Sequence, residues 1–230
     1  MNCEMGKLYV VSTPIGNLGD ITLRALEILR TVDIIACEDT RHTKKLLSHY
    51  SIKRPMTSYF EHNKFVSGRR LIENLKEGKD IALVSDSGTP GISDPGYYVV
   101  NLAIANGIEV VPIPGASALL CGLAASGAPT DRFTFEGYLP PKTKARKDRI
   151  NELKDERRTV IFYEAPHRLL NCLKDMKEVL GDRRIVIARE LTKRFEEIKR
   201  ARLSWLIQYF TEHKPRGEFV IILPKVEGKG

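Results

Sequence analysis

The chain has 230 residues, of which 42% are hydrophobic and 29% charged, a composition typical of globular proteins with one large domain or two smaller ones. No apolar run reaches the length of a membrane span, and the N-terminal MNCEMGKLYVV lacks the layout of a signal peptide, so we expect no membrane attachment. Four cysteines, Cys3, Cys37, Cys121 and Cys172, are widely spaced without a CxxC pair. This spacing indicates neither a zinc site nor a disulfide framework, and it suits a reducing cytoplasm.

The net charge of +8 belongs to the second half of the chain. Residues 1–115 carry 13 Lys and Arg against 13 Asp and Glu, whereas residues 116–230 carry 24 against 16. Such an asymmetry predicts a polyanionic partner that binds the second half. Solvated lysines without a partner are the alternative explanation.

Apolar runs and helical periodicity alternate along the first half. Strands are predicted at 7–13, 33–38, 56–60, 81–84 and 108–113, and helices at 23–31, 40–50, 64–77 and 95–106. Thr22 is suited to cap the first helix, Gly78 to end the third and Pro95 to open the fourth. This strict alternation predicts a parallel sheet with helices on both of its faces.

A change in composition near residue 114 predicts a domain boundary. Pro112, Pro114 and Gly115 interrupt the chain there, and a helix of small residues is predicted at 116–126. We therefore predict an N-terminal α/β domain at 1–114 and a strongly basic C-terminal α/β domain at 115–230. The second domain is predicted to have a mixed sheet, with strands at 133–138, 159–165, 184–190, 195–201 and 217–223 and helices at 142–158, 166–180 and 203–210.

Six polar loops rich in Gly and Pro follow predicted strands, at the end where open α/β sheets bind ligands. They are TPIGN (13–17), CEDTRHT (37–43), SDSGTPGISDPG (85–96), PIPGASA (112–118), YEAPHR (163–168) and ARELTK (188–193). The chain contains no GxxxxGK[ST], no GxGxxG after the first strand, and no GxSxG or HExxH. These absences argue against a P-loop NTPase, a dinucleotide-binding enzyme, an α/β-hydrolase and a zincin.

The order of these motifs along nearly the whole chain resembles one enzyme family. The strings are LYVVSTPIGNLGDIT, ACEDTRHTKKLL, LVSDSGTPGISDPG, VPIPGASA, FYEAPHRL and ARELTK. They look like the tetrapyrrole-methylase superfamily of S-adenosylmethionine-dependent methyltransferases, and more narrowly like its ribosomal RNA small subunit methyltransferase I branch. The resemblance implies two α/β domains with the cofactor in a cleft between them. It also implies a cytoplasmic homodimer that methylates the ribose 2'-hydroxyl of a cytidine in 16S rRNA of the small ribosomal subunit.

The resemblance further implies which residues contact S-adenosylmethionine. They are Ser87, Gly88, Thr89 and Ile92 along the methionine and ribose, Ile15 from the first loop, Ser117 and Ala118 from the small-residue helix, Tyr163 and Ala165 over the adenine, and Leu191 nearby. Backbone groups, hydroxyls and aliphatic side chains suit a neutral sugar and an apolar adenine, which need no phosphate-binding loop. Tight helix packing is the alternative role of Ser117 and Ala118.

Methyl transfer to a ribose hydroxyl is an in-line displacement that gains from alignment and from a nearby general base. The candidate bases are Glu38 and Asp39, which we prefer, and then Asp86, Glu164, Glu61 and His62. Capping a helix, or pairing with Arg41 or Arg168, is the competing role of these residues. Asp86 and Asp94 are expected to hold the shape of loop 85–96.

Contacts with RNA are expected mainly from the basic second half, where residues 142–149 hold five Lys and Arg and one Asp. The candidate substrate-binding residues are Asn17, Arg41, Lys142, Lys144, Arg146, Lys147 and Arg168. An ordinary solvated helix face is the alternative for residues 142–158. Those residues are expected to matter more here, because the chain stops soon after GEFVIIL where many members of the branch continue with a basic segment.

Two other functions stay open. One is a tetrapyrrole C-methyltransferase of the precorrin type on the same fold, and the other is a non-catalytic RNA-binding protein.

Overall fold

The computed structural model describes residues 4–225, which divide after Ser117 into two compact units. We call residues up to Ser117 the N-terminal unit and residues from Ala118 the C-terminal unit. The assignment of 1–114 and 115–230 as domains stays a prediction, because compactness alone does not test independent folding. Within residues 4–225, no helix combines the length and the apolar composition that crossing a membrane requires.

The N-terminal unit is built from alternating strands and helices. They are β1 (Leu8–Val11), η1 (Leu18–Asp20), α1 (Leu23–Thr31), β2 (Ile34–Cys37), α2 (Thr40–His49), β3 (Met56–Ser58), α3 (Lys64–Lys76), β4 (Ile81–Val84), α4 (Gly96–Ala105) and β5 (Val110–Ile113). The strands form one parallel sheet in the order β3-β2-β4-β1-β5, as the alternation predicted. Because β4 lies between β1 and β2, the loops that follow these three strands meet at one edge of the sheet.

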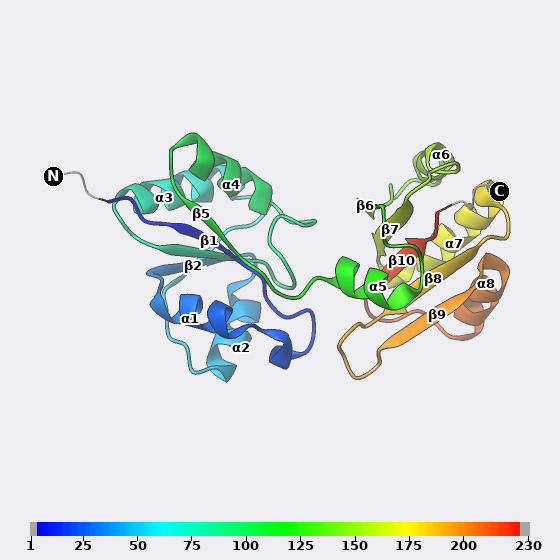
Figure 1. Cartoon of the computed structure of the whole chain (residues 1–230), viewed down its shortest axis with the longest axis horizontal. Helices are drawn as coiled ribbons and strands as arrows, with labels where there is room; N and C mark the ends of the chain where they lie inside the picture. The colour runs from blue at the N-terminus through cyan, green and yellow to red at the C-terminus, as the bar shows by residue number, and fades with distance from the viewer. Residues whose placement is uncertain (1–3, 226–230) are drawn as a thin grey trace. The chain divides into compact units, whose positions relative to one another are not determined.

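Helices cover both faces of this sheet (Figure 1). On one face, α1 and α2 pack against the strands through side chains such as Leu29 and Leu47. On the other face, α3 and α4 do so through side chains such as Leu75 and Val99. The strands of a sheet covered on both faces have no solvated side, which is why β4 is buried along its whole length and reads as a continuous apolar run.

The C-terminal unit has a mixed sheet, again as predicted. Its elements are α5 (Ala118–Ser126), β6 (Phe133–Tyr138), α6 (Thr143–Glu152), β7 (Thr159–Glu164), α7 (Pro166–Leu180), β8 (Arg184–Arg189), β9 (Glu197–Arg202), α8 (Leu203–Glu212) and β10 (Phe219–Leu223). The strand order is β6-β7-β10-β8-β9. Strands β6 and β7 are parallel, whereas the other neighbouring pairs are antiparallel.

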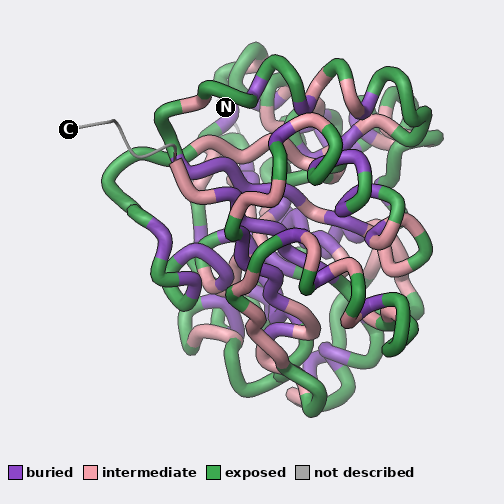
Figure 2. The backbone as a smooth tube through the Cα atoms, turned by 90° about the vertical axis from the view of Figure 1, so that its right-hand side faces the viewer, coloured by how far each residue is buried: buried purple, intermediate pink, exposed green. Residues whose placement is uncertain are grey.

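The central strand β10 is buried on both sides because its two faces meet different helices. Phe219 and Ile221 point into a core formed with α7 and α8. On the opposite face, Val220 lies against α5, where a Cβ added to Gly122 would be 3.1 Å from Val220 Cγ1. The small residues of α5 therefore have a packing role. Buried residues, purple in Figure 2, accordingly concentrate in the interior of the fold.

The largest difference between predicted and observed boundaries is in one helix of the C-terminal unit. The helix predicted at 142–158 is α6, which ends at Glu152. Leu153 turns into the core of the C-terminal unit. Downstream, the Glu156 carboxylate accepts hydrogen bonds from the backbone and the side chain of Arg158, which stabilise a turn in place of further helix.

Candidate functional site

The loops after β1 and β4 are joined by a pair of backbone hydrogen bonds. Thr13 N donates to Gly88 O at 2.9 Å, and Gly88 N donates to Thr13 O at 3.0 Å. Gly88 has a φ of 81°, which favours glycine, and a Cβ added there would be 3.4 Å from Ile15 Cγ2. The structure thus brings together Ile15 and Gly88, two of the predicted cofactor contacts.

The loop after β5 approaches the same place. The hydroxyls of Thr89 and Ser12 are hydrogen bonded at 2.9 Å, and Thr89 Oγ1 also donates to Ala116 O at 3.4 Å. A Cβ added to Gly115 would lie 2.8 Å from Ser12 Cβ, so only glycine allows this approach. Three loops are therefore locked together at the carboxyl edge of the sheet, beside Thr89.

The rest of loop 85–96 is shaped by its own carboxylates. The Asp94 carboxylate accepts hydrogen bonds from Gly91 N and Gly96 N, both at 2.8 Å, and Asp86 accepts one from Asp39 N at 3.1 Å. The predicted shaping role is confirmed for Asp94, whereas Asp86 joins loop 85–96 to the loop after β2. Two predicted cofactor contacts of this loop, Ser87 and Ile92, are exposed at its surface.

Asp39, one of the two preferred bases, caps a helix. Its carboxylate accepts a hydrogen bond from Arg41 N at 2.8 Å at the start of α2, and it pairs with Arg41 Nη2 at 2.8 Å. These bonds lower the pKa of Asp39 to about 2. A carboxylate that is so weakly basic and so fully engaged is poorly suited to accept a proton from a hydroxyl.

Glu38, its neighbour, lines a pocket of about 460 Å³ in the N-terminal unit. The other lining residues are Phe60, Glu61, Ser93, Asp94 and Pro95. Burial, reinforced by the nearby charges of Asp94 and Asp86, raises the pKa of Glu38. Among residues 4–225, no cation pairs with its carboxylate. Glu38 is therefore the more basic and the more available of the two preferred carboxylates.

Glu164 lies in the core of the C-terminal unit, where its side chain is 1% exposed. Its Oε1 accepts a hydrogen bond from Ala165 N at 2.9 Å and lies 3.2 Å from Arg168 Nε. Arg168 Nη2 also donates to Leu139 O. Both side chains hold the start of α7 against the sheet, which is the competing role that the sequence left open.

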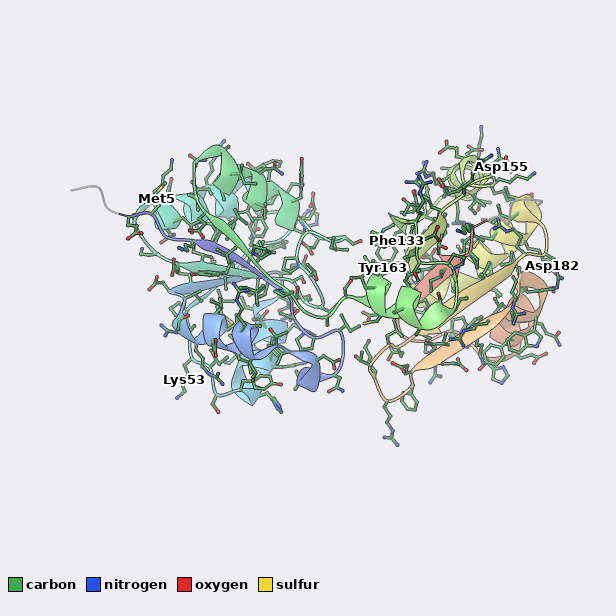
Figure 3. All side chains as sticks on the ribbon, in the orientation of Figure 1. Met5, Lys53, Phe133, Asp155, Tyr163 and Asp182 are labelled. Atoms are coloured by element: carbon green, nitrogen blue, oxygen red, sulfur yellow. The ribbon has the colours of Figure 1, made fainter. Side chains whose placement is uncertain are left out.

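Tyr163, a predicted cofactor contact, lies on β7 beside α5 (Figure 3). Its hydroxyl accepts a hydrogen bond from Leu119 N at 3.2 Å in the first turn of α5, and burial raises the pKa of Tyr163 to about 12. The ring packs edge-on against Phe135, with centroids 4.8 Å apart. Tyr163 thereby holds the start of α5, next to Ala118. Ala165 occupies the N-cap position of α7 without a side-chain hydrogen bond, and Leu191 is buried in the loop after β8.

The basic helix α6 offers fewer free cations than its sequence suggests. Arg146 is 4% exposed and pairs with Asp175, with Nη2 and Oδ2 2.6 Å apart, and Lys147 pairs with Glu178 at 2.7 Å. The remaining candidates on this segment, Lys142 and Lys144, are exposed. Asn17 is exposed and caps η1, while Arg41 is engaged with Asp39.

Comparison with known proteins identifies the family. Residues 7–207 match the sequence model of the Tetrapyrrole (Corrin/Porphyrin) Methylases. The Ribosomal RNA small subunit methyltransferase I of Synechocystis sp. is 53% identical over 95% of this chain and 79% of its own length. The protein of the same name from Halalkalibacterium halodurans is 52% identical over 99% of this chain and 78% of its own length. The chain belongs to the tetrapyrrole methylase family, in the branch of these methyltransferases.

Solved structures show the tetrapyrrole methylase fold at low sequence identity. Diphthine synthase has a TM-score of 0.75 at 16% identity, covering 96% of this chain and 91% of its own. A uroporphyrin-III C-methyltransferase from Thermus thermophilus, complexed with S-adenosyl homocysteine, has a TM-score of 0.64 at 17% identity, covering 94% of this chain and 97% of its own. These likenesses establish the architecture of this tetrapyrrole methylase.

Two residues of the site, Ser12 and Phe60, were not predicted from the sequence, whereas Gly115 lies in one of the six predicted loops. Ser12 and Gly115 fix the approach of the β5 loop, and Phe60 lines the Glu38 pocket. Gly115 carries a signal, because glycine between two prolines and small residues indicates close backbone approach. Ser12 and Phe60 carry none, since a serine at a strand end and an aromatic after a short strand are ordinary features.

Proposed function

We propose that this protein is an S-adenosylmethionine-dependent methyltransferase that acts on ribosomal RNA of the small subunit, at the ribose 2'-hydroxyl of a cytidine in 16S rRNA. The observation that carries the proposal is identity above 50% to proteins named Ribosomal RNA small subunit methyltransferase I, over at least 95% of the chain. The pocket that holds Glu38 supports it, because an oxygen acceptor needs a group that takes its proton. The setting is the cytoplasm, and the protein acts as a homodimer.

The methyl donor is S-adenosylmethionine, which supplies an electrophilic methyl group when bound. Loops that approach through Gly88 and Gly115 present backbone groups and hydroxyls, which fit a ligand without phosphates. The proposed cofactor contacts are Ile15, Ser87, Gly88, Thr89, Ile92, Ser117 and Ala118 in the N-terminal unit and Tyr163, Ala165 and Leu191 in the C-terminal unit.

Glu38 is the proposed general base. It takes the proton of the 2'-hydroxyl as the oxygen bonds to the methyl carbon and the bond from that carbon to sulfur breaks. A carboxylate with a raised pKa does this better than Asp39, whose proton affinity is held down by Arg41. Alignment of oxygen, methyl and sulfur supplies the remaining acceleration.

RNA phosphates are proposed to contact Lys142 and Lys144, which are exposed on and before α6. Asn17 and Arg41 are proposed substrate contacts of the N-terminal unit. The buried ion pairs of Arg146 and Arg168 favour a structural role for these two side chains, whereas Lys147, whose pair with Glu178 is solvated, stays a proposed phosphate contact.

The test is methyl transfer to small subunits from a strain that lacks the modification. Purified protein is incubated with methyl-labelled S-adenosylmethionine and with either 30S subunits or free 16S rRNA. We expect label in the RNA at one cytidine, whose 3' linkage becomes resistant to alkali because its 2'-oxygen is blocked. Absence of label in both substrates, while a control methyltransferase labels its own, would refute the proposal. Label in a precorrin instead of RNA would favour the tetrapyrrole alternative.

A further inference from the structure

The pocket beside Glu38 has one wall formed by the segment that follows β3. Phe60 N donates a hydrogen bond to Asn63 Oδ1 at 2.8 Å, and Asn63 Nδ2 donates to Ser58 O at 3.1 Å. These bonds fix a turn just before α3. Phe60 is held at the pocket by its backbone while the residue stays 37% exposed, so its ring is accessible to a ligand.

The opposite wall is the turn at 93–95, and Tyr59 ties the two walls together. Tyr59 is 1% exposed, and its hydroxyl donates to Pro95 O at 2.9 Å and accepts from Val99 N at 3.2 Å. Asp94 closes its own turn through Gly91 and Gly96. The pocket is therefore pre-formed by bonds within the N-terminal unit, which lowers the cost of binding a ligand there.

The chemistry of the lining selects against phosphate. Three of its residues are the acids Glu38, Glu61 and Asp94, and of the described lining residues none is basic. Such a pocket repels an anion and accepts hydrogen bonds from amino groups. The Asp94 carboxylate is used by its own turn, and Lys64 pairs with Oε1 of Glu61. Among residues 4–225, nothing donates a hydrogen bond to Oε2 of Glu61, which can therefore accept one from a ligand.

We propose that this pocket receives the base of the acceptor nucleotide, which stacks on Phe60 and donates a hydrogen bond from its exocyclic amino group to Glu61. The inference rests on the proposed function. Unstacked RNA bases are commonly recognised by stacking on aromatic side chains and by their Watson–Crick edges, and carboxylates accept from the amino group of cytosine. Uracil presents a carbonyl oxygen at that position, which a carboxylate repels. Glu38 lines the same pocket, so base and hydroxyl are recognised in one cavity.

The stacking role is tested with Phe60→Ala and Phe60→Trp on 30S subunits. We expect Phe60→Ala to lower kcat/KM for RNA by about 5- to 150-fold, the loss of one base stacked on an aromatic ring. Phe60→Trp should restore most of that loss, and the Kd for S-adenosylmethionine, measured by calorimetry, should not change. The matched control is Phe65→Ala, which removes an exposed ring on α3 that does not line the pocket.

The amino-group contact is tested with Glu61→Gln on subunits reconstituted with cytidine or uridine at the target. Wild type should prefer cytidine, and Glu61→Gln should lower that preference at least about 10-fold, because an amide can donate to the uracil oxygen. Glu73→Gln, on the exposed face of α3, is the control.

An unchanged cytidine preference in Glu61→Gln, or unchanged kcat/KM in Phe60→Ala, would refute the inference that this pocket binds the acceptor base. Methylation of RNA by the wild type would still support the proposed function. A wild type that methylates no RNA would overturn both.

Discussion

Two adjacent carboxylates, Glu38 and Asp39, have opposite environments. Asp39 faces Arg41 and the start of α2, which keep it ionised and occupied. Glu38 lines a pocket, where burial and then the charges of Asp94 and Asp86 raise its pKa and favour its protonated form. Of these two neighbours at the end of β2, Asp39 caps a helix and Glu38 is the candidate base. Their positions in the sequence alone do not show which residue has which role.

Replacement of Glu38 should separate catalysis from stability. We expect Glu38→Gln to slow methyl transfer by about 100-fold or more, the usual contribution of a general base, while the Kd for S-adenosylmethionine stays unchanged. The same variant should unfold at a higher temperature at neutral pH, because it removes a charge that the folded state disfavours. Single-turnover rates and thermal unfolding measure the two effects. Asp39→Asn is the control, and it should lose stability and keep most of its activity; equal activity losses in both variants would contradict the assignment.

The pH dependence of the rate follows from the same group. Because only the ionised carboxylate accepts a proton, the rate should rise with pH through the pKa of Glu38, which lies above the ordinary range for glutamate. The contribution of Glu38 to the free energy of unfolding should fall as pH rises. The folded state retains the Glu38 proton at pH values where the unfolded chain has lost it, so this residue destabilises the fold as pH rises. Rates measured across pH for wild type and Glu38→Gln check the assignment, and an inflection that persists in the variant would refute it.

At the scale of elements, the sequence predicted the boundaries of a helix correctly where local sequence signals agreed with the packing of that helix. Helix 23–31 begins at the Thr22 cap and ends as predicted, because an apolar stripe and a capping hydroxyl specify the same boundary. The helix predicted at 142–158 is seven residues shorter in the structure, where α6 spans Thr143–Glu152, because charged residues 154–158 favour helix by composition but are used by a local turn. The alternation of strands with helices also predicted the parallel sheet, and consecutive strands in the second half predicted the mixed one.

The buried pair between Arg146 and Asp175 joins α6 to α7 and should dominate the stability of that contact. Arg146 also donates from Nη1 to Pro141 O at 2.9 Å, and among the described residues its removal leaves the buried Asp175 carboxylate with only the more distant Lys147, whose Nζ lies 3.9 Å from Oδ1. We expect Arg146→Ala to lower the free energy of unfolding by about 3–5 kcal/mol. Urea denaturation measures this difference. The control is Lys147→Ala, which breaks a solvated pair with Glu178 on the same helix and should change stability little; similar losses in both variants would contradict a buried role for Arg146.

At the scale of the whole molecule, the sequence predicted two α/β sheets and the loops of one sheet edge, but not the pocket. Glu38, Phe60 and Ser93 come from three separate loops, and their assembly depends on the Tyr59 hydroxyl reaching Pro95 and Val99. A tyrosine in a short strand gives no sign of that link. The charge excess of the second half was evident, yet side-chain pairing decides which cations remain free, and pairing depends on contacts between α6 and α7.

Two exposed lysines at the start of α6 are expected to contribute to RNA binding by the basic half of the molecule. Lys142 and Lys144 are exposed, and each phosphate contact releases counterions, so the logarithm of the affinity should fall with the logarithm of the salt concentration. The double variant Lys142→Ala/Lys144→Ala should bind 16S rRNA more weakly at low salt and should reduce that slope by about 1.4–1.8 if both lysines contact phosphate. Filter binding across salt concentrations measures the slope. Lys44→Ala/Lys45→Ala removes the same charge from α2 in the half of the chain without net charge, and it should leave the slope unchanged. Equal slopes for the two double variants would mean that net charge alone attracts the RNA and that the exposed lysines at the start of α6 hold no phosphate.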